Sequence, residues 1–187
     1  VPDSGHRQGL NHKPESAGAG HYEVTLADSG IQVELTATKR VGIHRYTYPK
    51  GEEGNLILDL DHGIYNYDGK TLWAEIRVVS PTLVTGYRIT NGWARTNYTY
   101  FAMEFSRPVL EYGCKDKAPG PYQGGYGRYA RMNDFPEMAG RKLVAWFKFD
   151  TADSPELTVK VALSATGTTG ALKNLRAEAE GESFDTL

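Results

Sequence analysis

The sequence lacks several features that mark common protein classes. It has a single cysteine, Cys114, so it can form no internal disulfide and no cysteine-rich zinc site. No apolar run approaches the length that spans a bilayer, so we expect no membrane span. The 21 basic and 23 acidic residues give a net charge of −2, which provides no positive field for nucleic acid. No G-x-S-x-G, H-E-x-x-H, Walker or dinucleotide-binding pattern occurs.

Tyrosine and glycine are abundant instead, with 12 and 21 residues among 187. Tyrosine rings suit the half-buried surface of a strand, and glycine suits the turns between strands. The length allows one substantial domain. The composition therefore favours a single all-β domain.

Alternating apolar residues and regularly spaced turns support this expectation. Ile31, Val33, Leu35 and Ala37 fall on one face of a strand. The predicted strands cover residues 22–26, 31–38, 41–48, 55–60, 72–79, 82–91, 98–106, 109–113, 143–149 and 157–165. No long helical pattern separates them, which predicts an antiparallel β-sandwich rather than βαβ units.

The two ends and one internal segment differ from this pattern. Residues 1–20 show no periodicity and are predicted to form an extended arm before the β-sandwich domain at 21–167. Residues 112–140 are rich in Gly and Pro and are predicted to form a long loop. Near the end, Ala171, Leu172, Leu175 and Ala179 share one helical face, which predicts a short C-terminal helix with a threonine as N-cap.

Three side chains are candidates for sugar binding or for a domain interface: Trp93, Arg95 and His44. Trp93 and Arg95 lie between two predicted strands, where an indole ring can stack on a sugar and a guanidinium can donate paired hydrogen bonds. Trp93 could equally be a core residue, as we expect Trp73 and Trp146 to be. A lone strand histidine such as His44 is more often structural than catalytic.

A possible metal cluster is formed by Asp59, Asp61 and His62. Two carboxylates on one strand face and a nearby imidazole offer oxygen and nitrogen ligands. The other interpretation, which we favour, is a polar strand face that runs into a turn. The residues alone identify no catalytic pair.

Several segments, in the right order, resemble the N-terminal domain of family-92 glycoside hydrolases, which are exo-acting α-mannosidases. Residues 33–49, VELTATKRVGIHRYTYP, are similar to a signature of that family, and residues 12–22 and 84–95 match further segments. Shorter matches occur at 57–63, 100–106 and 169–175. The resemblance covers roughly residues 10–180, and it departs from the family pattern at Asn11 and His21.

This resemblance implies a supersandwich-like β-domain packed against a C-terminal (α/α)6 barrel of the same chain. Residues 168–187 would then be a helical linker toward that barrel. The family activity is Ca²⁺-dependent, inverting removal of terminal mannose from mannose-containing glycans. Inversion needs a general acid, a general base and room for a water between them.

The resemblance assigns no catalytic or metal residue to this chain. The acid, the base and the Ca²⁺ ligands come largely from the barrel, so the isolated segment is expected to be inactive. An apolar, exposed surface for the barrel is expected around Trp93, Tyr98 and the terminal helix. The habits of the family imply a periplasmic or secreted location.

One alternative is a purely structural adhesion sandwich with no ligand. The main alternative is a stand-alone carbohydrate-binding module without catalytic activity. It would explain the tyrosine content and the Gly- and Tyr-rich segment at 122–129 without a second domain. Binding of free mannose or mannan that is abolished by Trp93→Ala would support it.

Overall fold

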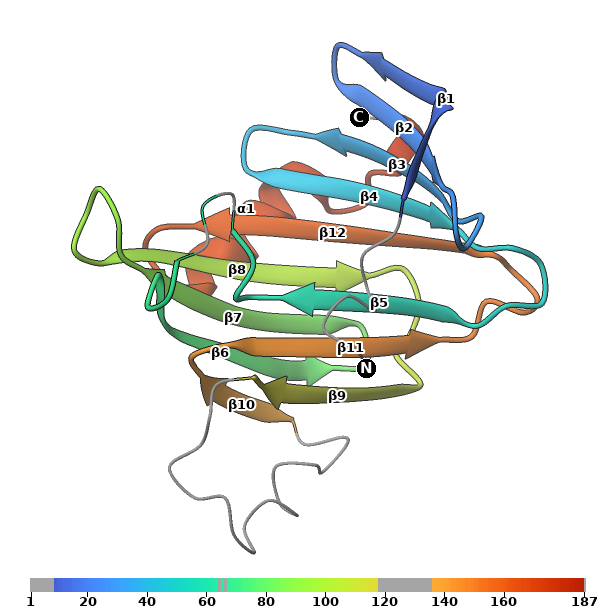
Figure 1. Cartoon of the computed structure of the whole chain (residues 1–187). Helices are drawn as coiled ribbons and strands as arrows, with labels where there is room; N and C mark the ends of the chain where they lie inside the picture. The colour runs from blue at the N-terminus through green and yellow to red at the C-terminus, as the bar shows by residue number, and fades with distance from the viewer. Residues whose placement is uncertain (1–8, 64, 66, 118–135, 187) are drawn as a thin grey trace, which may run out of the picture.

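The computed structural model describes residues 9–63, 65, 67–117 and 136–186. Its strands form two antiparallel sheets, one of nine strands and one of three (Figure 1). The elements are β1 (Leu10–Gly18), β2 (His21–Leu26), β3 (Gln32–Ala37), β4 (Val41–Thr47), β5 (Gly54–Asp59), β6 (Thr71–Ser80), β7 (Leu83–Thr90), β8 (Asn97–Phe105), β9 (Glu111–Asp116), β10 (Glu137–Gly140), β11 (Leu143–Phe149), β12 (Glu156–Ser164), α1 (Thr168–Ala179) and the 3-10 helix η2 (Phe184–Thr186).

The larger sheet has the order β1-β2-β3-β4-β12-β8-β7-β6-β10, and the smaller sheet has the order β5-β11-β9. Strand β12 returns late in the chain to pair with both β4 and β8. It thereby joins an N-terminal group of strands to a middle group. The predicted antiparallel β-sandwich with a short C-terminal helix is confirmed.

Strand alternation builds two separate apolar layers. Phe101, Met103 and Phe105 of β8 face the smaller sheet and join the main core. Ala102 points the other way, toward α1, and packs with Ala171 and Leu175 of that helix. The middle of the molecule therefore has three layers: the smaller sheet, the larger sheet and α1.

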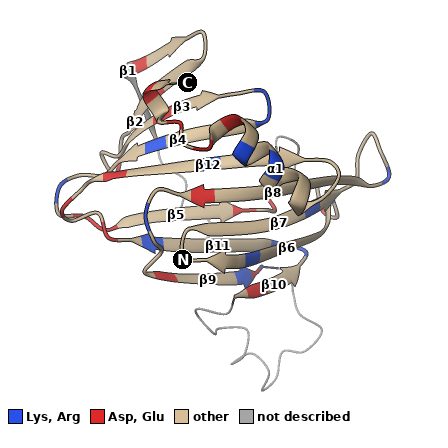
Figure 2. Ribbon diagram, turned by 180° about the vertical axis from the view of Figure 1, so that it is seen from behind, with Lys and Arg blue, Asp and Glu red and all other residues tan. Residues whose placement is uncertain are grey.

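Helix α1 lies against β12, β8 and β4 and is anchored near its C-terminal end (Figure 2). The Glu178 carboxylate accepts hydrogen bonds from the Thr38 hydroxyl at 2.6 Å and the Arg40 backbone N–H at 2.8 Å. The predicted threonine N-cap is wrong. The N-cap is Gly167, with no side-chain cap bond and a φ of 151° that favours glycine.

The predicted strands and the helix at the C-terminal end are all present, within a few residues at their ends. Two edge strands were not predicted: the nine-residue β1, and the four-residue β10, which lies within the predicted loop at 112–140. Strand β1 lies within the expected arm and pairs with β2, and β10 pairs with β6. Residues 118–135, which include the segment 122–129, lie outside the described residues.

The expectation that Trp73 and Trp146 are core residues is wrong. Trp73 is 40% exposed on the face of β6 that neither the smaller sheet nor α1 covers. Trp146 is half-buried on the outer face of β11, where it lies across Gly113 of β9. A Cβ on Gly113 would lie 2.7 Å from the indole ring, so the glycine is what allows this close contact.

None of the helices in the described part of the chain is long and apolar enough to cross a membrane. Figure 2 shows Lys and Arg interspersed with Asp and Glu around the ribbon.

Candidate functional site

Two loops at one end of the larger sheet are tied together by hydrogen bonds. The loop before β6 contains Tyr65, Tyr67 and Lys70, and the β7–β8 loop contains Asn91 and Trp93. The Tyr67 hydroxyl donates to Asn91 Oδ1 at 2.5 Å. The Asn91 N–H donates to the Lys70 carbonyl at 2.9 Å, and the Lys70 ammonium donates to the Tyr65 carbonyl. These bonds hold both loops in one arrangement.

A groove of about 600 Å³, which we call the rim groove, lies between these loops. Its described lining residues are Tyr65, Tyr67, Lys70, Thr90, Asn91, Gly92, Trp93, Ala94 and Asn97. Tyr65 is 80% exposed and Trp93 is fully exposed. The groove therefore presents aromatic surfaces and amide groups to solvent.

The three predicted site residues do not come together. Trp93 is exposed rather than in the core, and it lines the rim groove. Arg95 lies in the same loop, is exposed and does not line the groove. His44 lies on β4, where its Nδ1 is 2.9 Å from the Tyr46 hydroxyl, and burial lowers its pKa. Its partner and its burial suit a structural role.

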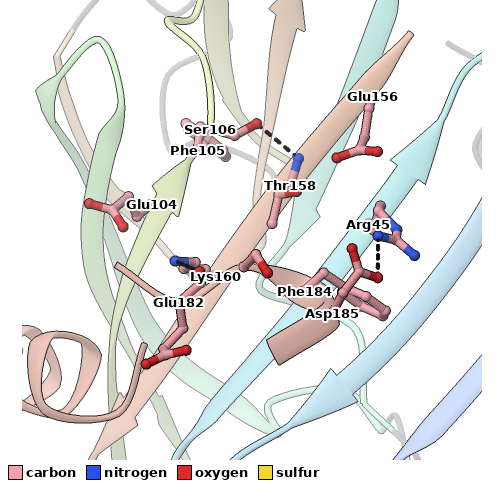
Figure 3. Close-up of a pocket in the computed structure, with 11 residues that line it drawn as sticks. Arg45, Glu104, Phe105, Ser106, Glu156, Thr158, Lys160, Glu182, Phe184 and Asp185 are labelled. Carbon is pink, nitrogen blue, oxygen red and sulfur yellow. Dashed lines mark hydrogen bonds and ion pairs between the residues drawn. The ribbon is translucent and has the colours of Figure 1, made fainter. Parts of the chain in front are cut away.

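A second pocket, of about 260 Å³, lies where the chain end crosses β4 and β12 (Figure 3). Arg45 donates to both Glu34 carboxylate oxygens at 2.7 Å and to Asp185 at 2.8 Å. Its guanidinium also lies 4.3 Å from the centre of the Phe184 ring. We call Glu34, Arg45, Phe184 and Asp185 the Arg45 clasp.

In the Arg45 clasp, Glu34 and Arg45 each bind the charge of the other, as in a structural ion pair. Hydrogen bonding to Arg45 holds the pKa of Glu34 below its ordinary value, and bonding to Glu34 raises the pKa of Arg45. Nearby, the Lys160 ammonium donates at 2.7 Å to the carbonyls of Ala179 and Glu182. This satisfies a carbonyl at the end of α1.

The described residues offer one group with metal-ligand geometry. Ligand atoms of His21, Glu23 and Glu34 lie within 4.8 Å of one another. Glu34 is already engaged by Arg45, and Glu23 accepts a hydrogen bond from Gln32. Calcium prefers six to eight oxygen ligands, so a set with an imidazole and two engaged carboxylates does not fit it.

The Asp59, Asp61 and His62 segment forms a turn in the structure. Asp59 Oδ1 accepts the backbone N–H groups of Asp61 and His62 at 2.9 and 3.1 Å, and Lys117 lies 3.3 Å from Oδ2. Strand β5 ends at Asp59, so Asp59 and Asp61 do not share a strand face. The bonds that Asp59 makes are those of a side chain that closes a turn.

An exposed apolar surface was expected around Trp93, Tyr98 and the terminal helix. The larger sheet has an aromatic face that includes Tyr98, and its extension across β6 and β7 was not predicted. Register places Trp73, Ile89 and Tyr98 side by side across β6, β7 and β8, with Tyr87 opposite Tyr100 in the next row. The Tyr87 and Tyr100 ring centroids are 5.7 Å apart, and Tyr98 stacks on Tyr100 at 6.1 Å. This aromatic sheet face lies beside α1 and has no covering layer among the described residues (Figure 2).

The described residues form a β-sandwich in which a long sheet is backed by a short sheet and by helix α1. It resembles a bacterial glucoamylase, with a TM-score of 0.51 at 11% identity over 89% of this chain and 24% of that one. At that identity the likeness concerns the fold alone.

The sequence matches the family described as "Glycosyl hydrolase family 92 N-terminal domain" over residues 1–164, and the chain belongs to this family. It is similar to the GH92 α-mannosidase BT3965 from Bacteroides thetaiotaomicron, with 33% identity and a TM-score of 0.83. That match covers 100% of this chain and 24% of BT3965. The inverting mannosidase BT2199 from B. thetaiotaomicron VPI-5482 matches at 26% identity and a TM-score of 0.74, over 94% of this chain and 21% of that one. No curated protein sequence matches.

Proposed function

We propose that this chain is the N-terminal β-sandwich of a Ca²⁺-dependent, inverting exo-α-mannosidase that acts on mannose-containing glycans. Family membership and the likeness to two GH92 mannosidases support this proposal. The chain spans about a quarter of the length of those structures. The chemistry, including the Ca²⁺ ligands, is assigned to a separate barrel domain, in keeping with the poor fit of His21, Glu23 and Glu34 to calcium.

The observation that carries the proposal is the aromatic sheet face. Trp73 and Tyr98 are large aromatic side chains, 40% and 44% exposed on one side of β6 and β8, with Ile89 between them. A contiguous exposed patch of this kind marks a surface that another body covers. We assign that body to the catalytic barrel, which the sandwich would support while it forms one side of the sugar pocket. A stand-alone binding module would need no such covered face.

One experiment compares the purified chain of 20.7 kDa with the native polypeptide from its source. The native polypeptide should be several times heavier and should release mannose from α-mannobiose, with activity lost in a calcium chelator. The purified chain should release none, with or without Ca²⁺. Mannose release by the purified chain, or a native polypeptide that hydrolyses no α-mannoside, would overturn the proposal.

A variant of the native polypeptide tests the face itself. Trp73→Asp places a charge in the proposed contact, so its melting temperature and activity should fall. The matched control is Ile57→Asp, because Ile57 is equally exposed but lies on the outer face of the smaller sheet. Equal losses in both variants would show that the aromatic sheet face has no special contact.

A further inference from the structure

We propose that the rim groove is a sugar-binding subsite in its own right, and that Trp93 and Tyr65 form its stacking platform. It would hold one sugar ring of the glycan, away from the atoms that react. The mannose class of that sugar rests on the proposed function, whereas the sugar-binding property rests on the groove alone.

Both rings of the proposed platform are exposed to solvent. Trp93 is fully exposed and Tyr65 is 80% exposed, although both side chains have large apolar faces. A sugar ring has an apolar face of C–H groups that covers an aromatic ring well, while its hydroxyl groups stay at the edge. Both rings therefore present the surface that one face of a pyranose would cover.

Hydrogen-bonding groups also line the groove around this platform. Asn91 Oδ1 accepts from the Tyr67 hydroxyl, which fixes the amide and leaves Nδ2 with no hydrogen bond to any described residue. The Asn97 side chain likewise makes none within the described part of the chain, and it lines the same groove. Amides of this kind can donate to and accept from sugar hydroxyls.

The described lining of the rim groove lacks acidic and large aliphatic side chains. None of its described lining residues is an acid, which disfavours a cation as ligand. None is Leu, Ile, Val, Met or Phe, so the apolar surface of the groove comes from its aromatic rings and Ala94. The aromatic sheet face, by contrast, has the aliphatic side chain of Ile89 between Trp73 and Tyr98.

The rim groove lies next to the aromatic sheet face. Asn97 lines the rim groove, and the next residue, Tyr98, belongs to the aromatic sheet face. A sugar in the groove would therefore lie at the edge of the proposed domain contact. A glycan that extends from a pocket in the barrel can reach that edge. The groove would then bind a ring beyond the terminal mannose.

The test is a titration of the purified chain with α-linked mannotriose and, separately, with cellotriose, followed by calorimetry and by ligand-observed NMR. The variants are Trp93→Ala and Tyr65→Ala, with Trp73→Ala as the control because Trp73 is an exposed indole outside the groove. Circular dichroism checks that each variant is folded. We expect mannotriose binding that weakens at least tenfold in Trp93→Ala, severalfold in Tyr65→Ala and less than twofold in Trp73→Ala.

Two results would overturn the subsite: no binding of either sugar, or binding that Trp93→Ala leaves unchanged. Either result leaves the mannosidase assignment to the activity comparison of the native polypeptide. Trp93-dependent binding of cellotriose alone would have the opposite meaning. It would support the sugar subsite and overturn the mannose class on which the proposed function depends.

Discussion

The Arg45 clasp and the rim groove both combine aromatic rings with polar side chains, but they differ in burial and in hydrogen bonding. In the clasp, Arg45 is 18% exposed and Glu34 12% exposed, each bonded to the other, and the Phe184 ring is buried beneath the guanidinium. In the rim groove the aromatic rings face outward, and Asn91 has donor groups unused by the described chain. The first set of side chains is paired within the chain, whereas the second faces solvent and is open to a ligand.

The largest effect is expected from Arg45→Met. This change leaves the Glu34 carboxylate largely buried without its cation and releases Asp185 and Phe184. Removal of one member of a buried pair costs about 3–5 kcal/mol, and the exposure of Asp185 reduces this to about 2–3 kcal/mol. Urea unfolding followed by circular dichroism measures it.

The matched control is Arg77→Ala, because Arg77 also makes two hydrogen bonds to one carboxylate, that of Glu137. Both partners there are about half exposed, so the loss of stability should be much smaller than in Arg45→Met. Similar losses in the two variants would remove the distinction between the clasp and an ordinary surface pair.

The next effect is expected from Phe184→Ala. Phe184 is 8% exposed and packs in the second apolar layer with Ala171 and Leu175 of α1. Because the ring also lines a pocket and is not in the main core, we expect a loss of about 2 kcal/mol rather than the full cost of a central phenylalanine. Hydrogen exchange should quicken at residues 181–186. Unchanged exchange there would show that the tail is held by other contacts.

A smaller effect is expected on lowering the pH. Arg45 holds the pKa of Glu34 below its ordinary value of 4.5, so the folded state favours the ionised carboxylate. The resulting stability is present above pH 4.5 and is lost as the pH falls through the folded pKa. Glu178, whose pKa is lowered to about 2 by Thr38 and Arg40, acts in the same direction between pH 4.5 and about 2.

Thermal melts between pH 6 and 3 check this prediction. Glu34→Gln should reduce the acid loss by roughly a few degrees in melting temperature, because the amide does not titrate. Glu137→Gln is the control, since that carboxylate is exposed and should leave the profile unchanged. An identical profile for Glu34→Gln and the parent chain would contradict the role of Glu34.

The difference between the two regions also shows what the sequence could predict. Alternation predicted β3 because Val33 and Leu35 share the face that packs inward, whereas β8 and β12 have buried residues on both faces. Strand β1 could not be predicted within the arm, because residues 10–18 show no alternation of apolar and polar residues and pair only with β2. Strand periodicity could have corrected the prediction that Trp73 is a core residue, because Trp73 shares a face of β6 with Glu75 and Arg77. Ile76 lies on the opposite face.

The clasp lay beyond prediction because Arg45 and Asp185 are 140 residues apart, and no local pattern joins them. Part of the rim groove could have been predicted from the sequence. Strands β6 and β7 form a hairpin in which Thr71 pairs with Thr90, so the residues just outside it, Lys70 and Asn91, had to meet. Trp93 follows in the same loop. Its exposure depended on the absence of a covering layer, which the sequence did not reveal.

The smallest effect is expected from Trp93→Ala. A fully exposed side chain with no ring contact in the described structure should change the free energy of unfolding by less than about 0.5 kcal/mol. Trp146→Ala is the contrast, because that ring packs on Gly113 and should cost about 1–2 kcal/mol. Urea midpoints of both variants decide the point. A loss above about 1 kcal/mol for Trp93→Ala would show that this side chain stabilises the fold. A negligible loss would show that folding does not require a large apolar ring at this exposed position. The ring would then be explained by what it binds.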